Sequence, residues 1–97
     1  MKNKEKRMKN EIWKFDVKLH SFELEMPKGA KILTFQTQRH IPRIWVLIDW
    51  DVAGTAKETR KFMIQGTGMG FIDNGKYIGS VQEMDGEFIW HLFEILK

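Results

Sequence analysis

The chain has 97 residues, a formal net charge of +3 and no cysteine, which excludes disulfides, thiolate metal sites and a cysteine nucleophile. Its length suits one domain with a modest core, and no apolar run approaches the roughly 20 residues that span a bilayer. No apolar segment follows the basic start as in a signal peptide, so the sequence predicts a soluble, cytoplasmic protein without membrane contact.

The positive charge is concentrated at the N-terminus. Five basic residues and one acidic residue lie in the first ten positions, so this segment carries +4 and the other 87 residues carry −1. A charged segment of low hydrophobicity cannot offset its ordering entropy. Residues 1–10 are therefore expected to form a basic, flexible arm, and residues 11–97 a single all-β domain. The triplet Met-Lys-Asn begins at both Met1 and Met8, which leaves either methionine as the native start.

The segments after the arm alternate apolar and polar residues with a period of two, which is typical of β-strands. In the first segment Trp13, Phe15 and Val17 alternate with charged residues, and in the third Leu33 and Phe35 are expected to share one face. Proline and glycine residues separate several of these segments, as they do in turns. Strands are predicted over residues 12–19, 21–26, 31–39, 43–50, 58–65, 77–82 and 87–95.

The composition of individual segments indicates how these strands are arranged. The strand over 43–50 is apolar at every position from 44 to 48, so it needs cover on both faces and is expected to be central. Residues 51–57 are polar and are predicted as a loop, and Asp85-Gly86 favours a hairpin between the last two strands. The fold class is all-β, with about seven antiparallel strands in a small sandwich or partly open barrel. The strand order does not follow from the pattern.

Three glycines, Gly66, Gly68 and Gly70, interrupt the longest irregular stretch of the chain. A phosphate-binding loop would need a following Lys-Ser/Thr pair and a helix N-terminus, and the sequence offers neither. A tight connection is the simpler interpretation, although glycines also allow a ligand to approach the backbone closely. These three glycines and the adjoining Phe71 are therefore binding candidates.

The polar residues form no catalytic or metal-binding motif. Asp49 and Asp51 are separated by one residue and have no third ligand nearby, so they are expected to cap a strand end. His20, His40 and His91 are scattered, and no Gly-x-Ser-x-Gly elbow exists. His91 is expected to be half-buried with a hydrogen bond. The sequence predicts no catalytic residue, no metal site and no cofactor, and the protein is expected not to be an enzyme.

Aromatic and basic residues near strand ends are further binding candidates. Trp13 and Trp50 lie near the ends of predicted strands, where an exposed indole could act as a binding hot spot. Arg39 and Arg43 bracket a predicted turn and form a small basic tip, which could bind an anion or a nucleic acid. No aromatic RNA-binding motif accompanies this tip in the sequence.

A series of segments in a fixed order extends over residues 12–94, nearly the whole chain without the arm. The segments are 26–33 (MPKGAKIL), 36–38 (QTQ), 44–49 (IWVLID), 66–68 (GTG), 77–82 (YIGSVQ) and 88–94 (FIWHLFE). This series resembles a family of short, uncharacterised all-β proteins encoded by phages and prophages. The resemblance implies a phage origin and supplies no activity, ligand or site residue.

Several binding functions are compatible with these observations. The first expectation is a small phage-type accessory protein, a non-enzymatic binding module on a host or viral protein that could counteract a host defence. The alternatives are a sponge for a small nucleotide signal, and nucleic-acid binding through the basic arm and the Arg39/Arg43 tip. A homo-oligomer is also compatible with the sequence, for example if the strand over 58–65 is an edge that pairs with a second copy.

Overall fold

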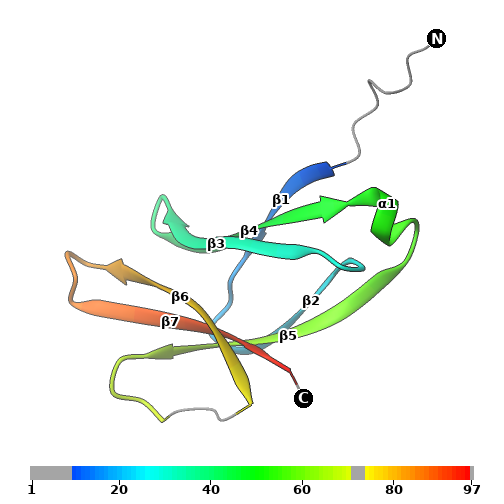
Figure 1. Ribbon diagram of the computed structural model, residues 1–97. Helices are drawn as coiled ribbons and strands as arrows, with labels where there is room; N and C mark the ends of the chain where they lie inside the picture. The colour runs from blue at the N-terminus through cyan, green and yellow to red at the C-terminus, as the bar shows by residue number, and fades with distance from the viewer. Residues whose placement is uncertain (1–9, 71–73, 97) are drawn as a thin grey trace.

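The computed structural model describes residues 10–70 and 74–96, and within them seven antiparallel strands form two sheets that face each other (Figure 1). This arrangement confirms the predicted all-β class, and the two sheets do not close into a barrel. The elements are β1 (Asn10–Asp16), β2 (His20–Pro27), β3 (Lys31–Gln38), β4 (Ile41–Asp49), α1 (Trp50–Ala53), β5 (Lys57–Gly66), β6 (Gly75–Glu83) and β7 (Phe88–Ile95).

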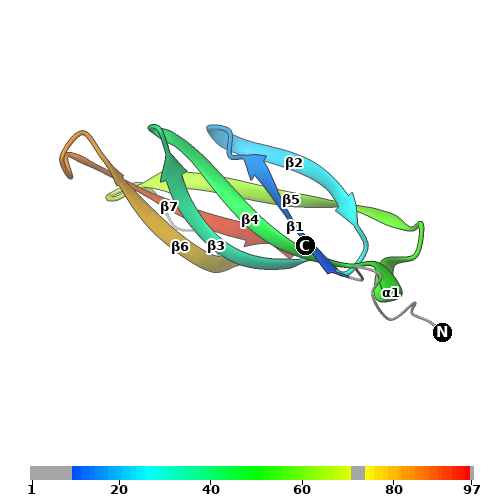
Figure 2. The same ribbon diagram turned by 90° about the horizontal axis from the view of Figure 1, so that it is seen from above.

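The strand order defines which strands are interior. One sheet has the order β1-β4-β3 and the other has the order β2-β5-β7-β6 (Figure 2). The predicted central position of the strand over 43–50 is confirmed, because β4 pairs with a strand on each side. The interpretation of residues 58–65 as an edge was wrong, because β5 lies between β2 and β7 and pairs with both.

The core lies between the two sheets and follows from the alternation along each strand. From β4, the side chains of Ile44, Val46 and Ile48 point inward and are fully buried. From the facing sheet, the ring of Phe62 stacks on that of Phe22 with centroids 5.5 Å apart. Burial of such side chains contributes on the order of 1.5–3 kcal/mol each. The outward residues of the same strands leave two broad outer faces, one on each sheet.

The N-terminal boundary of the first strand differs from the expectation. Asn10, assigned to the arm, is the first residue of β1 and pairs with Asp49 of β4. β1 ends at Asp16, and Val17 donates from its backbone N–H to the carbonyl oxygen of Pro42 over 2.9 Å. The other residues of the predicted arm, 1–9, lie outside the described part of the chain.

The predicted loop over 51–57 contains one helical turn, α1. The turn forms because an Asp49 carboxylate oxygen accepts hydrogen bonds from the backbone N–H groups of Asp51 (3.0 Å) and Val52 (3.3 Å). A capping aspartate satisfies amides that have no partner in the first turn of a helix. Asp49, expected with Asp51 to cap a strand end, is the last residue of β4, and its carboxylate caps the helical turn that follows.

The β3–β4 connection is tighter than predicted. Arg39 and His40 form a two-residue turn with φ values of 53° and 69°, and Gln38 pairs directly with Ile41. Two positive φ values give the turn the twist that a short hairpin needs. β4 consequently begins at Ile41 rather than at residue 43.

A register shift between Ile32 and Thr34 places Leu33 differently from the expectation. The extra residue of a β-bulge breaks the alternation of faces. Leu33 therefore does not share the inward face of Phe35, and its side chain is 45% exposed. The bulge adds an apolar side chain to the surface of the β1-β4-β3 sheet.

Candidate functional site

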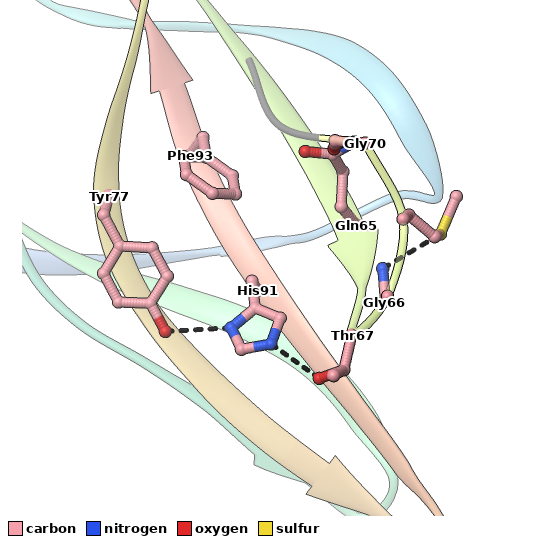
Figure 3. Close-up of a pocket in the computed structure, with 9 residues that line it drawn as sticks. Gln65, Gly66, Thr67, Gly70, Tyr77, His91 and Phe93 are labelled. Atoms are coloured by element: carbon pink, nitrogen blue, oxygen red, sulfur yellow. Dashed lines mark hydrogen bonds between the residues drawn. The ribbon is translucent and has the colours of Figure 1, made fainter. Parts of the chain in front are cut away.

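A hollow of about 370 Å³ lies on the outer face of the β2-β5-β7-β6 sheet, where the loop after β5 turns over the neighbouring strands (Figure 3). We call residues 66–70 the glycine loop and this cavity the glycine-loop hollow. Three separate segments of the chain form its walls. The lining residues are Gln65, Gly66, Thr67, Gly68, Met69, Gly70, Tyr77, His91 and Phe93.

The glycine loop is held by its own backbone and by β7. The N–H of Met69 donates to the Gly66 carbonyl over 3.2 Å, and the N–H of Gly66 contacts the Met69 sulfur at 3.1 Å. The N–H of Thr67 donates to the carbonyl of Ile89 in β7 over 3.2 Å. Gly68 has a φ of 93°, a conformation that glycine adopts without the steric cost of a Cβ. The loop is therefore a specific turn over the sheet.

The imidazole of His91 joins the glycine loop to β6. Its Nε2 lies 2.8 Å from the Thr67 hydroxyl, and its Nδ1 lies 2.9 Å from the Tyr77 hydroxyl (Figure 3). A neutral imidazole has one donor and one acceptor nitrogen, so one hydroxyl donates to the ring and the other accepts from it. The expectation of a half-buried, hydrogen-bonded His91 is confirmed.

Aromatic rings form the apolar part of the hollow. Phe93 is buried although it points outward from β7. The Tyr77 ring packs edge to face on the Phe93 ring with centroids 5.3 Å apart, and the imidazole of His91 lies 5.8 Å from the Tyr77 ring centroid. The outer face of this sheet therefore carries a small apolar cluster of its own, separate from the core between the sheets.

Gln65 supplies the remaining polar group at the edge of the hollow. Its side-chain N–H donates to the carbonyl oxygen of Gly70, which closes the base of the loop. Its Oε1 atom is buried and has no hydrogen-bond partner within residues 10–70 and 74–96. An unsatisfied buried acceptor costs about 1–3 kcal/mol.

The hollow is uncharged. Its described lining contains no Lys, Arg, Asp or Glu side chain. Recognition of a phosphate depends on cationic side chains or on a set of aligned backbone N–H groups. The arrangement of aromatic rings and two hydroxyls is instead suited to an uncharged group with one or two polar atoms.

The structure brings together three of the sequence-predicted binding candidates and separates the others. Gly66, Gly68 and Gly70 all line the glycine-loop hollow. Phe71 lies outside the described residues. Trp50 is distant from this hollow in the fold, because it begins α1 at the end of the β1-β4-β3 sheet.

The two tryptophan candidates are not free surface residues. The rings of Trp13 and Trp50 contact each other, and both pack on the core. Because large parts of both rings are buried, both tryptophans stabilise the fold. Neither ring is fully exposed, and a role of either tryptophan in binding stays a prediction.

The two arginine candidates lie on the other sheet. Arg39 and Arg43 line a hollow of about 350 Å³ together with Lys14, Gln38 and Ile41. The β1 register places Asn10 and Asp16 at opposite ends of the β1-β4 pair. The basic tip beside Asp16 is thus at the end of this strand pair opposite to Asn10.

The sequence did not reveal Thr67, Tyr77 and Phe93 as parts of one site. Tyr77 and His91 come together only because a register shift in β6 places Tyr77 opposite Phe93 and Ser80 opposite His91. The alternation along β7 does place His91 and Phe93 on one face. That alternation is the sequence signal that could have identified His91 and Phe93 as members of one site.

The fold and the hollow define a small two-sheet β-sandwich with a candidate binding site on one outer face. The chain belongs to the family described as the domain of unknown function DUF7352, whose profile matches residues 8–96. Neither a curated protein nor a solved structure matches the chain.

The described residues contain neither a metal-binding cluster nor a membrane-spanning helix. No group of three or more His, Cys, Asp or Glu side chains that could hold a metal ion is found within 10–70 and 74–96. Across the same ranges, no helix is long and apolar enough to cross a membrane.

Proposed function

We propose that this protein is a non-enzymatic binding module that engages a partner protein through the glycine-loop hollow. The observation that carries the proposal is the hollow itself, an uncharged cavity with aromatic walls and a few convergent polar atoms. A cavity of about 370 Å³ is at the small end of the range for ligand pockets. It is of a size to receive one apolar or aromatic side chain as the anchor of an interface.

The surroundings of the hollow support a protein partner. Met69 is 57% exposed and Tyr77 is 52% exposed, so apolar surface continues from the cavity to its rim. Aromatic residues and methionine are enriched in the buried centres of protein interfaces. A nucleotide signal would bring phosphates to a lining that offers no described cation, so the sponge alternative receives less support from this site.

The hydrogen bonds of His91 support binding rather than catalysis. Thr67, His91 and Tyr77 form a chain with the order of a nucleophile, a base and an orienting group. In a catalytic triad the third member is a carboxylate, which stabilises the imidazolium formed during the reaction. Here the third member is a neutral phenol, and no charged side chain lines the described part of the cavity.

The biological setting belongs to the same proposal. The resemblance to phage and prophage proteins is the ground for proposing a partner in a bacterial host, where the protein would act in the cytoplasm and its capture of a host protein would counteract a defence. A chain without cysteine is compatible with a reducing compartment.

The test is affinity capture from a host lysate with the full chain and two matched variants. Met69→Glu places a charge at the rim of the hollow, and Met84→Glu places the same charge on the β6–β7 turn, where the side chain is 64% exposed. The proposal expects one protein that the original chain and Met84→Glu retain and Met69→Glu loses, with both variants folded.

Two results would overturn the proposal. Equal retention of the partner by Met69→Glu and Met84→Glu would place the interface elsewhere. A nucleotide that raises the melting temperature of the original chain and not that of Met69→Glu, without any retained protein, would replace it with the small-ligand function.

A further inference from the structure

The outer face of the β1-β4-β3 sheet carries two neighbouring hollows, whereas the glycine-loop hollow lies on the other sheet. The first is the basic hollow described above, lined by Lys14, Gln38, Arg39, Ile41 and Arg43. The second, which we call the Trp45 hollow, has a volume of about 330 Å³ and is lined by Ile12, Leu33, Thr34, Gln36 and Trp45.

The basic hollow holds more positive charge than its neighbours neutralise. Lys14 Nζ and Arg43 Nη1 donate to the same uncharged acceptor, Gln38 Oε1, over 2.8 Å and 2.6 Å. Asp16 is ion-paired with Arg43 at 3.1 Å, and its side chain is mostly exposed. With Arg39 on the hairpin turn, these four charged groups sum to a net +2. Two cations that share a neutral oxygen still attract an anion.

The Trp45 hollow adjoins the basic hollow through the register of the sheet. Lys14 of β1 pairs directly with Trp45 of β4, and Gln36 of β3 pairs with Arg43. Residues directly opposite on adjacent strands have Cβ atoms about 4.5–5.5 Å apart. The cationic groups and the indole therefore lie next to each other on one face.

Apolar side chains flank the indole. Ile12 is 62% exposed on β1, and the β-bulge in β3 turns Leu33 outward. A ring bordered by aliphatic side chains and lying beside cations matches how proteins bind single-stranded nucleic acid, where bases stack on aromatic residues and phosphates lie against Lys and Arg. Base faces are available for stacking in a single strand, whereas those in a duplex are already stacked.

We propose that this face binds single-stranded nucleic acid, with a base on Trp45 and the adjoining phosphate against Lys14 and Arg39. Arg43 is already hydrogen-bonded to Gln38 and ion-paired with Asp16. It therefore holds these side chains in place and adds to the positive electrostatic potential of the face. The charge of the face favours this polyanion over an apolar protein segment. The proposal is independent of the partner proposed for the glycine-loop hollow, which lies on the other sheet.

The test is fluorescence anisotropy of labelled oligothymidylate and oligouridylate of about 12 nucleotides, with the full chain at about 50 mM and about 200 mM salt. Lys14→Gln and Arg39→Gln are each expected to weaken binding several-fold and to reduce the salt slope by about 1. Lys61→Gln is the matched control, since this lysine pairs with Glu23 and lines a hollow on the other sheet.

The stacking part of the site is tested separately. Trp45→Leu is expected to weaken binding about tenfold with little change in the salt slope. Ile12→Glu serves as a second variant, because this exposed edge position tolerates a charge without loss of folding and the added carboxylate repels the strand. Met69→Glu is expected to leave nucleic-acid binding unchanged, which separates this test from that of the proposed protein partner.

The proposal fails under clear outcomes. One is the absence of binding by the full chain at about 50 mM salt. Another is equal weakening by the Lys14 and Lys61 variants. A third is binding that survives all face variants and disappears when residues 1–9 are deleted, since it would then belong to the N-terminal arm. A ratio of the two affinities far from one would name DNA or RNA as the ligand.

Discussion

The indole rings of Trp13 and Trp50 meet edge to face, with centroids 5.8 Å apart and planes at 64°. Trp13 comes from the edge strand β1, and Trp50 is the first residue of α1. Trp13 also donates from its ring N–H to a Glu11 carboxylate oxygen over 2.9 Å. The pair fixes the position of α1 against the end of the β1-β4-β3 sheet.

This contact predicts an energetic coupling between the two tryptophans. Edge-to-face aromatic pairs contribute about 0.5–1.5 kcal/mol beyond the area that they bury. In a double-mutant cycle of Trp13→Leu and Trp50→Leu, urea unfolding is expected to give a coupling of this size. Trp13→Leu combined with Trp90→Leu is the control cycle and should be additive, and a cycle for Trp13 and Trp50 without coupling would contradict the contact.

The β3–β4 turn predicts a stabilising substitution. His40 has a φ of 69°, a left-handed conformation that costs a residue with a Cβ about 1–2 kcal/mol. His40→Gly is expected to raise the free energy of unfolding by about 1 kcal/mol and to raise the melting temperature. Thr59→Gly in the middle of β5 is the opposite case and should lower both quantities. A lower melting temperature for His40→Gly would show that its ring contact with Glu83 matters more than the turn.

The ion pair of Arg60 and Glu94 joins β5 to β7. Arg60 Nε and Nη2 donate to the two Glu94 oxygens over 2.7 Å and 2.9 Å, and Nη1 donates to the Ala30 carbonyl over 2.5 Å. The hydrogen bond with Glu94 raises the pKa of Arg60 from an already very basic value, although burial opposes this shift. The guanidinium therefore stays charged throughout the physiological pH range.

Removal of one partner of this pair is expected to be destabilising. Both side chains are largely buried, so Glu94→Gln leaves the Arg60 cation with only the Glu58 carboxylate at 3.9 Å and should lower the free energy of unfolding by about 1–3 kcal/mol. Glu87→Gln in the exposed β6–β7 turn removes the same charge and should change stability by less than about 0.5 kcal/mol. The free energy of unfolding of both variants is measured by chemical denaturation. An equal decrease in both variants would contradict a stabilising role for the Arg60–Glu94 pair.

The hydrogen bonds at His91 predict a spectroscopic signature. Tyr77→Phe removes the partner of Nδ1, and Thr67→Val removes the partner of Nε2. Each variant is expected to shift the ¹⁵N resonance of its own ring nitrogen more than that of the other nitrogen. Ser80→Ala is the control, because Ser80 lies directly opposite His91 in the register. A similar shift of both nitrogens in all three variants would contradict the two specific bonds.

The local sequence patterns predicted which residues form strands, but not which strands pair with each other. The uniform apolar run in β4 identified a central strand. The expected cover on both faces was wrong, because Trp45 lines a hollow on the outer face of the sheet. The Asp85-Gly86 turn correctly joined β6 to β7. The pairing of β1 with β4 and of β2 with β5 depends on contacts between distant parts of the chain, which periodicity does not encode.

The same limit applies to the candidate sites. The glycine loop was recognisable from its composition, whereas its partners Tyr77 and His91 are 14 residues apart and meet through the register of a hairpin. Leu33 lies on the outer face because of a β-bulge, which the local residue pattern does not predict. Trp13 and Trp50 were recognised as unusual, yet their mutual contact depends on α1, which one capping carboxylate creates.

The strand order also determines the sequence in which the protein can be assembled during synthesis. Among the described strands, the neighbours in the chain that also pair with each other are β3 with β4 and β6 with β7. β1 has no partner until β4 has emerged from the ribosome, and β2 must wait for β5. The two hairpins can form within microseconds, but closure of the sheets is limited by long-range pairing. The sheet that carries the glycine loop is completed last, because its interior strand β7 is the final one to be made.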